Sequence, residues 1–393
     1  MECPVEKSRR GELLIVPHLQ AHRAASGNLV LTRKFLEGTA AYAAQWPGRV
    51  TVAVTVEAKP DTNLDHQEIA PGDWPFHVIK QPSPRQELFR RMQQAAMVLI
   101  SENLVVCKIA PAVRYAVVTE YSLKTRLRIA METTRNPLRR LKRHFRERWT
   151  EHRARRGLAA AAGVQCNGFP TYESYRTLNP NSLLFFDSRV RSRELVDGEA
   201  LDRRLARLQA NQPLRLLFSG RLIGIKGVDH LPKIAHELRR RNVPFHMSIC
   251  GAGEGQASLA QKVRDLGLAD RVTLRGVLDF TRELLPLARD ATDLFICPHV
   301  QGDPSCTYLE TMACGVPIVG YANEAWQPLA KLSRAGWQTP MDDPAALADR
   351  VAQLHHQRSD IATASLAARR FAGQHTFEKT FSRRVDHLLT LAR

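Results

Sequence analysis

The sequence has no paired-cysteine motif. Its seven cysteines are odd in number and widely scattered, and no two of them have Cys-x-x-Cys spacing. This pattern argues against a disulfide framework and against a cysteine zinc site. We therefore expect reduced thiols, as in a cytoplasmic protein.

Long hydrophobic runs are also lacking. A helix needs roughly 20 apolar residues to cross a bilayer, and no run approaches that length. The start of the chain carries Glu2 and Glu6 before a short apolar run at 13–16, so no secretory leader is expected. The sequence predicts a protein that is cytoplasmic or peripheral on the inner face of the membrane.

Acidic residues are few relative to basic ones. The chain has 57 Lys and Arg against 39 Asp and Glu, which gives a formal net charge of +18. Such a charge favours anionic partners, namely a nucleotide-sugar, a phospholipid surface, a polyanionic acceptor or a nucleic acid. Charge alone does not choose among them.

Residues 135–156 form the most basic segment. Ten Arg or Lys stand there against Glu147 and Glu151. Apolar residues recur through the segment at helical spacing, namely Leu138, Leu141, Phe145 and Trp149. This composition fits a helix that lies on an anionic membrane surface. It equally fits a surface helix whose apolar stripe packs on its own domain.

The order of apolar and helical segments predicts an α/β fold. In the first half we expect strands at 12–17, 50–56, 76–79, 104–107, 115–119, 163–166 and 183–186, with helices at 29–42 and 86–100. In the second half we expect strands at 214–219, 245–250, 271–274, 293–297 and 317–320, alternating with helices at 228–240, 256–266, 282–288 and 306–313. This alternation is typical of Rossmann-like, doubly wound domains with mostly parallel sheets.

The length of 393 residues fits two such domains. We place an acceptor-binding domain at 1–205 and a donor-binding domain at 206–375. A C-terminal helix is expected at 376–393, packing back on the first domain.

Two glycine turns follow predicted strands in the second half. The first holds Gly220, Arg221 and Lys226, and the second holds Gly251 and Gly253. Glycine lets a backbone approach a ligand closely, and a helix start offers free N–H groups. Together with the two cations, these turns would suit a pyrophosphate.

The strongest pattern is the segment 298–319. A loop after a strand enters a helix that bears Glu310 and ends at Gly315, and Pro317 opens the next strand. A carboxylate in such a helix can accept hydrogen bonds from two neighbouring hydroxyl groups, as on a ribose. Taken alone, Glu310 would more often be an ordinary surface residue.

These motifs resemble the donor-binding domain of retaining GT-B glycosyltransferases of family 4, the group 1 glycosyltransferases. The resemblance covers roughly 214–343. It implies that Arg221 and Lys226 bind the donor diphosphate without a metal ion or other cofactor, and that Glu310 binds the ribose. The remaining donor-binding residues that it implies are Gly220, Gly251, Gly253, Val277, Leu278, Ser305, Cys306 and Thr307.

The sequence departs from that family at one position. The family usually has two glutamates seven residues apart, and the first position here is Gly302. Asp303, the next residue, is the candidate to present a carboxylate to the sugar. Pro304 lacks the backbone N–H that a glycine-rich loop would offer.

The acceptor side is less defined. Gly27 and Asn28 follow the first strand, and Glu120 follows the strand at 115–119 where many relatives carry a histidine. His18 and His22 are four apart, but no carboxylate or cysteine completes a metal site.

The resemblance implies a retaining transferase that moves a sugar from a UDP- or GDP-sugar to a glycan or lipid-linked acceptor. Two alternatives stay open. The protein can be a non-catalytic or phosphorylase-like GT-B member, since the first glutamate is missing. It can also be a basic nucleic-acid-binding protein, although no nucleic-acid motif is present and a nucleic acid is not the expected partner.

Overall fold

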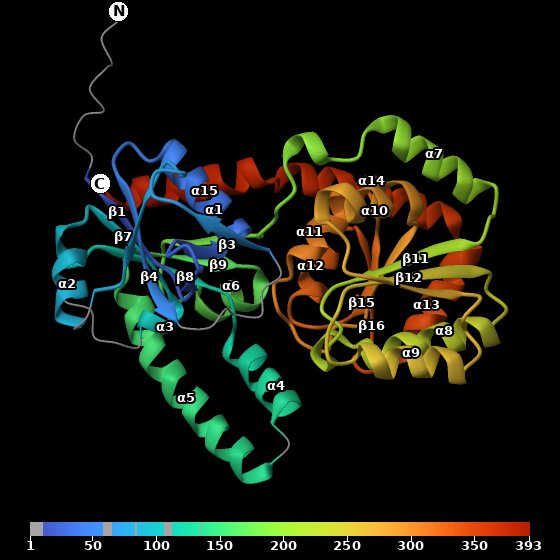
Figure 1. The fold of residues 1–393 in the computed structure, drawn as a ribbon. Helices are drawn as coiled ribbons and strands as arrows, with labels where there is room; N and C mark the ends of the chain where they lie inside the picture. The colour runs from blue at the N-terminus through green and yellow to red at the C-terminus, as the bar shows by residue number, and fades with distance from the viewer. Residues whose placement is uncertain (1–10, 58–64, 83–84, 106–111, 135) are drawn as a thin grey trace, which may run out of the picture. The chain divides into compact units, whose positions relative to one another are not determined.

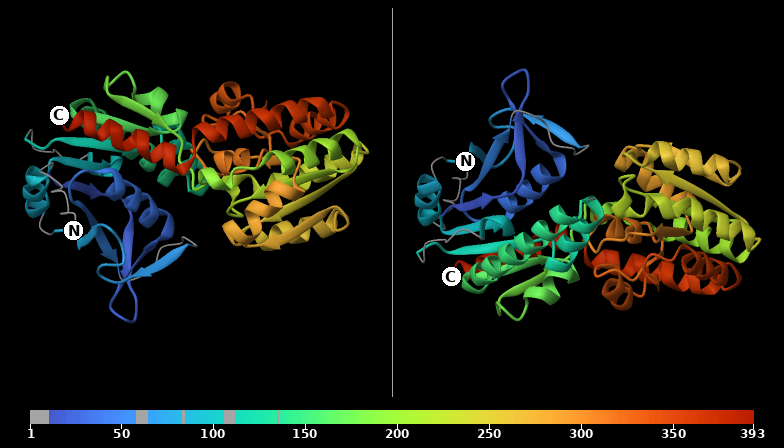
Figure 2. Two further views of the ribbon diagram at one scale, coloured as in Figure 1. Left: turned by 90° about the horizontal axis from the view of Figure 1, so that it is seen from above. Right: turned by 90° about the horizontal axis from the view of Figure 1, so that it is seen from below.

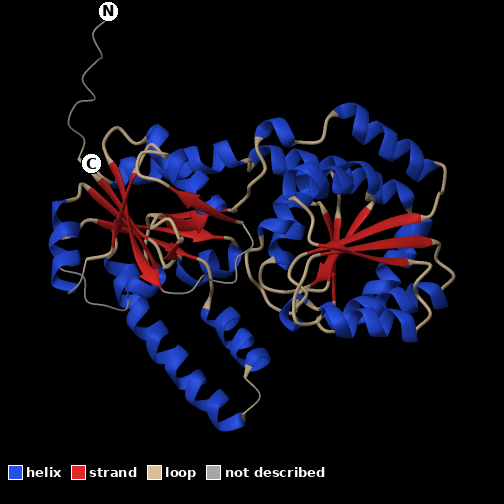
Figure 3. Ribbon diagram, viewed as in Figure 1, coloured by secondary structure: helices blue, strands red, loops and turns tan. Residues whose placement is uncertain are grey.

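The structure, a computed structural model, describes residues 11–57, 65–82, 85–105, 112–134 and 136–393. The chain divides into two compact units (Figure 1). Unit 1 comprises Met1–Leu123, His144–Phe185 and Glu378–Arg393. Unit 2 comprises Lys124–Arg143 and Phe186–Phe377. Each unit has a central sheet with helices against it (Figure 3).

Unit 1 is built on a mixed sheet. Its strands are β1 (Leu13–Val16), β2 (Gln20–Arg23), β3 (Leu29–Thr32), β4 (Val50–Glu57), β5 (His66–Ile69), β6 (His77–Lys80), β7 (Met97–Ser101), β8 (Tyr115–Thr119), β9 (Gly163–Asn167) and β10 (Ser182–Phe185). The order is β10-β9-β8-β7-β1-β4-β2-β3-β5, with β6 also on β4. Only the β2–β3 and β3–β5 pairs are antiparallel among the described strands. Strands β1 and β9 are buried at every position, as expected where both faces are covered.

The helices of unit 1 surround this sheet. They are α1 (Arg33–Gln45), α2 (Arg85–Gln94), α3 (Glu102–Val105), α6 (Phe169–Tyr175), most of α5 (Pro137–Ala160) and nearly all of α15 (Phe377–Leu391). Figure 2 shows α15, in red, lying along unit 1. Arg384 of α15 donates to Gln165 of β9 (Nε to Oε1, 2.9 Å), and Phe381 meets the ring of Tyr42 edge-on at 5.3 Å.

Three sequence expectations for unit 1 were wrong in detail. The first four residues of the expected helix 29–42 form β3. The expected helix 86–100 ends at Gln94, and Met97–Ser101 forms β7. Of the expected strand 104–107, the first two residues form the end of α3 instead, and the other two lie outside the described residues. Short apolar runs beside a helix do not reveal by periodicity where the helix stops.

Unit 2 is a doubly wound domain, as predicted. Its strands are β11 (Leu214–Ser219), β12 (Phe245–Cys250), β13 (Val272–Gly276), β14 (Leu294–Cys297), β15 (Ile318–Tyr321) and β16 (Gly336–Thr339). All pairs are parallel, in the order β13-β12-β11-β14-β15-β16. The winding direction reverses between β11 and β14, so the carboxyl ends of these two strands flank the switch point where such sheets bind ligands.

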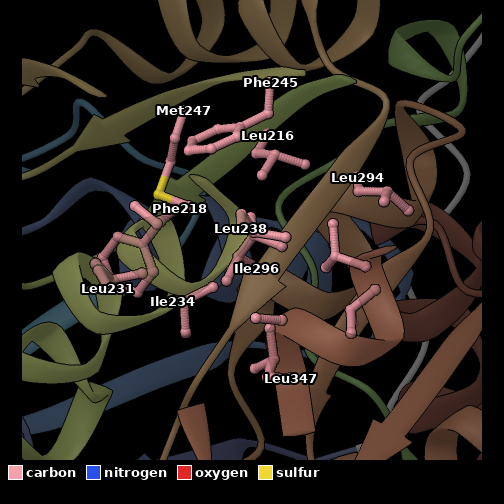
Figure 4. Close-up of a cluster of buried hydrophobic side chains, with 14 of the residues drawn as sticks. Leu216, Phe218, Leu231, Ile234, Leu238, Phe245, Met247, Leu294, Ile296 and Leu347 are labelled. Carbon is pink, nitrogen blue, oxygen red and sulfur yellow. The ribbon is translucent and has the colours of Figure 1, made fainter. Parts of the chain in front are cut away.

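Helices cover both faces of the sheet of unit 2. The helices of unit 2 are α7 (Gly198–Gln209), α8 (Leu231–Arg240), α9 (Gln256–Asp265), α10 (Leu285–Ala291), α11 (Cys306–Ala313), α12 (Trp326–Ser333), α13 (Pro344–His356) and α14 (Arg358–Gln374), with short helical turns at Ser192–Glu194, Gly224–Lys226, Val228–His230 and Phe280–Leu284. Unit 2 also contains nearly all of α4 (Leu123–Thr133). The core joins side chains of β11, β12 and β14 to α8 and α13; Phe218, Phe245, Ile296, Leu238 and Leu347 represent it (Figure 4).

The sequence placed a single boundary at 205/206, whereas the chain enters unit 2 for 124–143 and again at Phe186. The polar helix α7 therefore belongs to unit 2. Its Arg204 is buried and donates to the carbonyls of Gly315 (2.6 Å) and Ala288 (3.2 Å), and burial lowers the Arg204 pKa to about 10. Because Arg204 binds backbone carbonyl groups of unit 2, one face of α7 is packed. The polar composition of the helix does not reveal this.

No helix within the described ranges combines the length and the apolar composition that a bilayer-spanning segment requires.

Candidate functional site

The candidate site lies at the carboxyl edge of the sheet of unit 2. Strand β11 runs into the turn that holds Gly220, Arg221 and Lys226, and β12 runs into Gly251. Strand β14 leads through residues 298–305 into α11. Because β12, β11 and β14 are neighbours, these three connections share one edge.

Two glycines allow the connections to touch. Gly227 has φ +71°, and a Cβ added there would lie 1.9 Å from the carbonyl oxygen of Pro298, beyond β14. Gly251 has φ +131°, and its added Cβ would lie 1.9 Å from the carbonyl oxygen of Gly220. No other residue fits either place without moving the neighbouring backbone. The turn after β11 is thus held against both flanking loops.

Lys226 and Asp303 form a buried ion pair across the switch point. The Lys226 Nζ atom lies 3.0 Å from Oδ1 and 2.8 Å from Oδ2 of Asp303. Burial alone would raise the Asp303 pKa, but the charge and the hydrogen bonds of Lys226 outweigh burial and lower it. Asp303, which was predicted to face the sugar, is thus bound to Lys226, which was predicted to bind the diphosphate.

Buried polar atoms beside this pair have unused hydrogen-bonding capacity. Among the described residues, neither ring nitrogen of His299 has a hydrogen-bond partner, and the same holds for Oε1 of Gln301. Burial and the nearby Lys226 lower the pKa of His299 to about 3, so its imidazole is neutral at pH 7. Buried polar groups are normally paired, so these atoms lack partners that the described part of the protein does not supply.

Glu310 is held in place by an arginine that the sequence did not single out. The carboxylate projects from α11, is 8% exposed, and accepts a 2.8 Å hydrogen bond at Oε1 from Nε of Arg189. The guanidinium of Arg189 lies 3.9 Å from the centre of the Phe280 ring. A carboxylate has two oxygens, so pairing at Oε1 leaves acceptor capacity for ribose hydroxyl groups.

A second acidic residue, Glu324, lies beside Gly302. A Cβ added to Gly302 would lie 2.8 Å from Cβ of Glu324, which follows β15. The carboxylate of Glu324 accepts from Thr125 (Oγ1 to Oε2, 2.9 Å) and lies 3.2 Å from Lys124 Nζ. The sequence did not single out Glu324, although its position three residues after a strand end of the same sheet was an available signal.

The other predicted donor residues lie along the same edge. Arg221 is exposed, as is Val277 with 56% exposure, and Leu278 is half-buried. Ser305 is the N-cap residue of α11, and the half-buried Cys306 and Thr307 form its first turn. Helix starts of this kind bind anions through free N–H groups.

The predicted acceptor residues lie in unit 1. Gly27, with φ +88°, and Asn28 lie between β2 and β3, where Asn28 donates to Glu68 (Nδ2 to Oε1, 2.9 Å). Hydrogen bonds from Ser26 and Asn28 lower the Glu68 pKa. Glu120 is exposed beyond β8, and its backbone N–H donates to Glu102 (3.4 Å).

His18 and His22 do not join a ligand cluster. Within the described ranges, no group of three or more His, Cys, Asp or Glu residues is arranged to hold a metal ion.

Comparison with solved structures defines the fold. The chain is similar to HepE (Alr3699) of Anabaena in complex with UDP, with a TM-score of 0.66, 14% identity, and coverage of 96% of this chain and 99% of that one. It is also similar to WaaG, a glycosyltransferase involved in lipopolysaccharide biosynthesis, with a TM-score of 0.62, 14% identity, and coverage of 95% and 99%. The chain has the GT-B fold of these proteins, as predicted.

Most of unit 2 matches a known sequence family. Residues 213–357 match the family described as glycosyl transferases group 1. Over 166 residues, 40% of each chain, this protein is 30% identical to the amylovoran biosynthesis glycosyltransferase AmsK of Erwinia amylovora. Over 184 residues, 45% of each chain, it is 26% identical to WcaL of Escherichia coli K12, a putative colanic acid biosynthesis glycosyltransferase. The chain thus matches less than half the length of these curated relatives.

Proposed function

We propose that the protein is a glycosyltransferase that moves a sugar from a nucleotide-sugar donor to a hydroxyl group of a glycan or lipid-linked acceptor. One observation carries the proposal: Lys226 and Glu310 lie on the two connections that flank the switch point, and both belong to the segment that matches group 1 glycosyl transferases. The curated relatives in polysaccharide synthesis support the acceptor class.

The donor diphosphate binds at the cationic turn after β11. Lys226 and Arg221 supply positive charge, and the glycines Gly220, Gly251 and Gly253 let the backbone approach the phosphates. As the bond between sugar and diphosphate breaks, these cations stabilise the negative charge on the leaving group, so no metal ion or other cofactor is needed. The UDP bound to HepE supports a nucleotide in this role.

The ribose and base occupy the adjoining part of the edge. Glu310 accepts from the ribose hydroxyl groups while Arg189 orients it. The backbone at Val277 and Leu278 holds the base, and the start of α11 at Ser305, Cys306 and Thr307 faces the phosphates. The base is that of a UDP- or GDP-sugar.

The sugar lies beside Gly302, where Glu324 contributes the carboxylate that Gly302 lacks. The two Cβ positions are only 2.8 Å apart, so the carboxylate of Glu324 starts from nearly the same point as that of a glutamate at 302. Transfer proceeds with retention of the anomeric configuration. Gly27, Asn28 and Glu120 serve the acceptor, and the reaction takes place in the cytoplasm.

The experiment is a donor panel. The purified protein is incubated with UDP- and GDP-sugars and with membrane-extracted acceptors, and release of nucleoside diphosphate is measured. We expect turnover with one donor, and a loss of about tenfold or more in both Lys226→Met and Arg221→Gln. Lys233→Gln, an exposed lysine of α8, is the matched control.

Binding of a donor without any release of diphosphate would instead identify a non-catalytic binder. Near-normal turnover in both variants would contradict the roles assigned to Lys226 and Arg221.

A further inference from the structure

The helix α5 carries an apolar stripe. Within the described residues, no other segment covers this stripe. Its four members are well exposed: Leu138 at 76%, Leu141 at 54%, Phe145 at 64% and Trp149 at 57%. At 3.6 residues per turn, they lie on one face within roughly 80°. We call these four residues the α5 stripe.

The opposite face of α5 is the one that packs. Glu151, Ala154 and Leu158 are its buried residues, roughly 150° around the helix from the stripe. Glu151 accepts from Tyr175 (Oη to Oε2, 3.0 Å), and Leu158 joins the core of unit 1. In Figure 1 the last turns of α5 lie against the sheet while the earlier turns extend away from it. Packing therefore fixes the direction of the stripe and leaves it exposed.

The charges of α5 are arranged around the stripe. The helix has nine Arg or Lys and two Glu. Lys142 and Arg146 border the stripe on one side and Arg148 on the other, and all three are exposed. Both glutamates lie on the far side of the helix wheel. The exposed half of α5 is thus apolar in the middle and cationic on both borders.

We propose that α5 binds an anionic lipid surface, with the stripe inserted among the acyl chains and the bordering cations on the lipid phosphates. An amphipathic helix with a basic polar face gains from both apolar burial and attraction to anionic lipid. If two copies of the protein met through this face, their positively charged borders would repel each other. A nucleic acid would use the cations and leave four large apolar side chains in water. The lipid surface satisfies both features at once.

The test measures binding of the full chain to vesicles by flotation. Vesicles of phosphatidylcholine with about one third phosphatidylglycerol should bind the protein, and pure phosphatidylcholine vesicles should bind it far less. Phe145→Ser/Trp149→Ser should weaken binding about tenfold or more, because apolar burial is lost. The control Leu332→Ser/Leu366→Ser removes two exposed leucines from unit 2, at 55% and 48% exposure, and should bind as the unaltered protein does.

A second pair of variants tests the charge. Lys142→Gln/Arg146→Gln/Arg148→Gln should weaken binding about a hundredfold, since each cation near the surface contributes roughly one decade or less. Lys233→Gln/Arg264→Gln/Arg370→Gln removes the same charge from exposed positions of unit 2 and should change binding little. A melting temperature for each variant verifies folding.

Three results would overturn the proposal. The first is equal binding, or none, to both kinds of vesicle. The second is unchanged binding in the Phe145/Trp149 variant, which would mean simple charge attraction. The third is a different partner for the stripe: either binding of single-stranded RNA without binding of vesicles, or a dimer that the Phe145→Ser/Trp149→Ser variant dissociates. Vesicle binding requires no sugar donor, so its outcome is independent of the transferase proposal.

Discussion

In the proposed site, the carboxylate of Asp303 and the donor diphosphate would compete for one cation, that of Lys226. Asp303→Asn keeps a side chain of the same size and an acceptor oxygen, but it removes the negative charge. We expect this variant to bind a nucleoside diphosphate several-fold more tightly, whereas Lys226→Met binds it more weakly. Isothermal titration calorimetry measures both. Weaker diphosphate binding by Asp303→Asn would show that the carboxylate organises the phosphate site instead of competing with it.

His299 makes the stability of unit 2 depend on pH. Its pKa is about 3 in the folded protein, below the ordinary value of 6.5. The unfolded chain therefore takes up a proton first, and stability is lost as the pH falls below about 6.5. At pH 5 the expected loss relative to pH 7 is about 2 kcal/mol from this residue.

Chemical denaturation at both pH values tests this expectation. His299→Gln does not titrate in this range, so the difference in unfolding free energy between pH 7 and pH 5 should shrink by that amount. An unchanged difference would mean that His299 is protonated in the fold.

Substitution of Glu324 distinguishes the sugar end of the proposed site from its nucleotide end. In Glu324→Gln the hydrogen bond from Thr125 can be kept, and the charge next to Gly302 is lost. We expect turnover to fall by about tenfold or more, with little change in nucleoside diphosphate affinity. Steady-state kinetics and calorimetry distinguish the two. If the variant instead lost affinity for the nucleoside diphosphate, Glu324 would lie at the nucleotide end of the site and the proposed role at the sugar end would be wrong.

At the scale of elements, Gly227 lets the turn after β11 lie against the loop after β14. Gly227→Ala combines a left-handed φ of +71° with a Cβ only 1.9 Å from the Pro298 carbonyl oxygen. We expect a loss of roughly 2–4 kcal/mol in unfolding free energy, since the loops must separate. Gly224→Ala in the same turn, with nothing within 4 Å and no positive φ, is the control. Denaturant unfolding of both variants decides the matter, and equal effects would refute the close-approach argument.

The elements of unit 2 were largely predictable. The expected ranges of β11, β12 and α11 agree with the structure residue for residue, because a proline comes just before each strand, a glycine comes just after it, and Gly315 follows the end of the helix. In unit 1 the strand β7 was hidden, since its apolar residues continue the helical spacing of α2. Strand β3 was hidden in the same way at the start of α1.

The site was predictable where it depends on sequence spacing, and unpredictable where it depends on contacts between distant segments. Lys226, Asp303 and Glu310 were named from their motifs. Arg189 and Glu324 reach the same edge from other parts of the chain, and only the fold brings them there. Likewise, the sequence could identify the α5 stripe but not which face of α5 packs, which Glu151 and Leu158 decide.

At the scale of the whole molecule, unit 1 depends on a helix that is distant in sequence. Arg384 of α15 lies over the rings of Phe185 (4.1 Å) and Phe381 (5.2 Å) and donates to Gln165. Arg384→Met should destabilise unit 1 by about 2 kcal/mol, because the buried acceptor of Gln165 loses this donor. Nucleoside diphosphate binding by unit 2 should stay unchanged.

Hydrogen exchange followed by peptide mass analysis tests this expectation. Protection should fall in β8 and β9 and persist in β11 and β12. A uniform loss of protection across both units would contradict it.

The chain leaves and re-enters unit 1, and Glu378–Arg393 is the last part to return. During translation, these residues leave the ribosome only after all of Phe186–Phe377 has been made. Unit 2 thus has its complete sequence while unit 1 still lacks the helix that covers Gln165. We therefore expect a chain that ends at residue 377, once it is released from the ribosome, to hold a folded second unit and an unfinished first one.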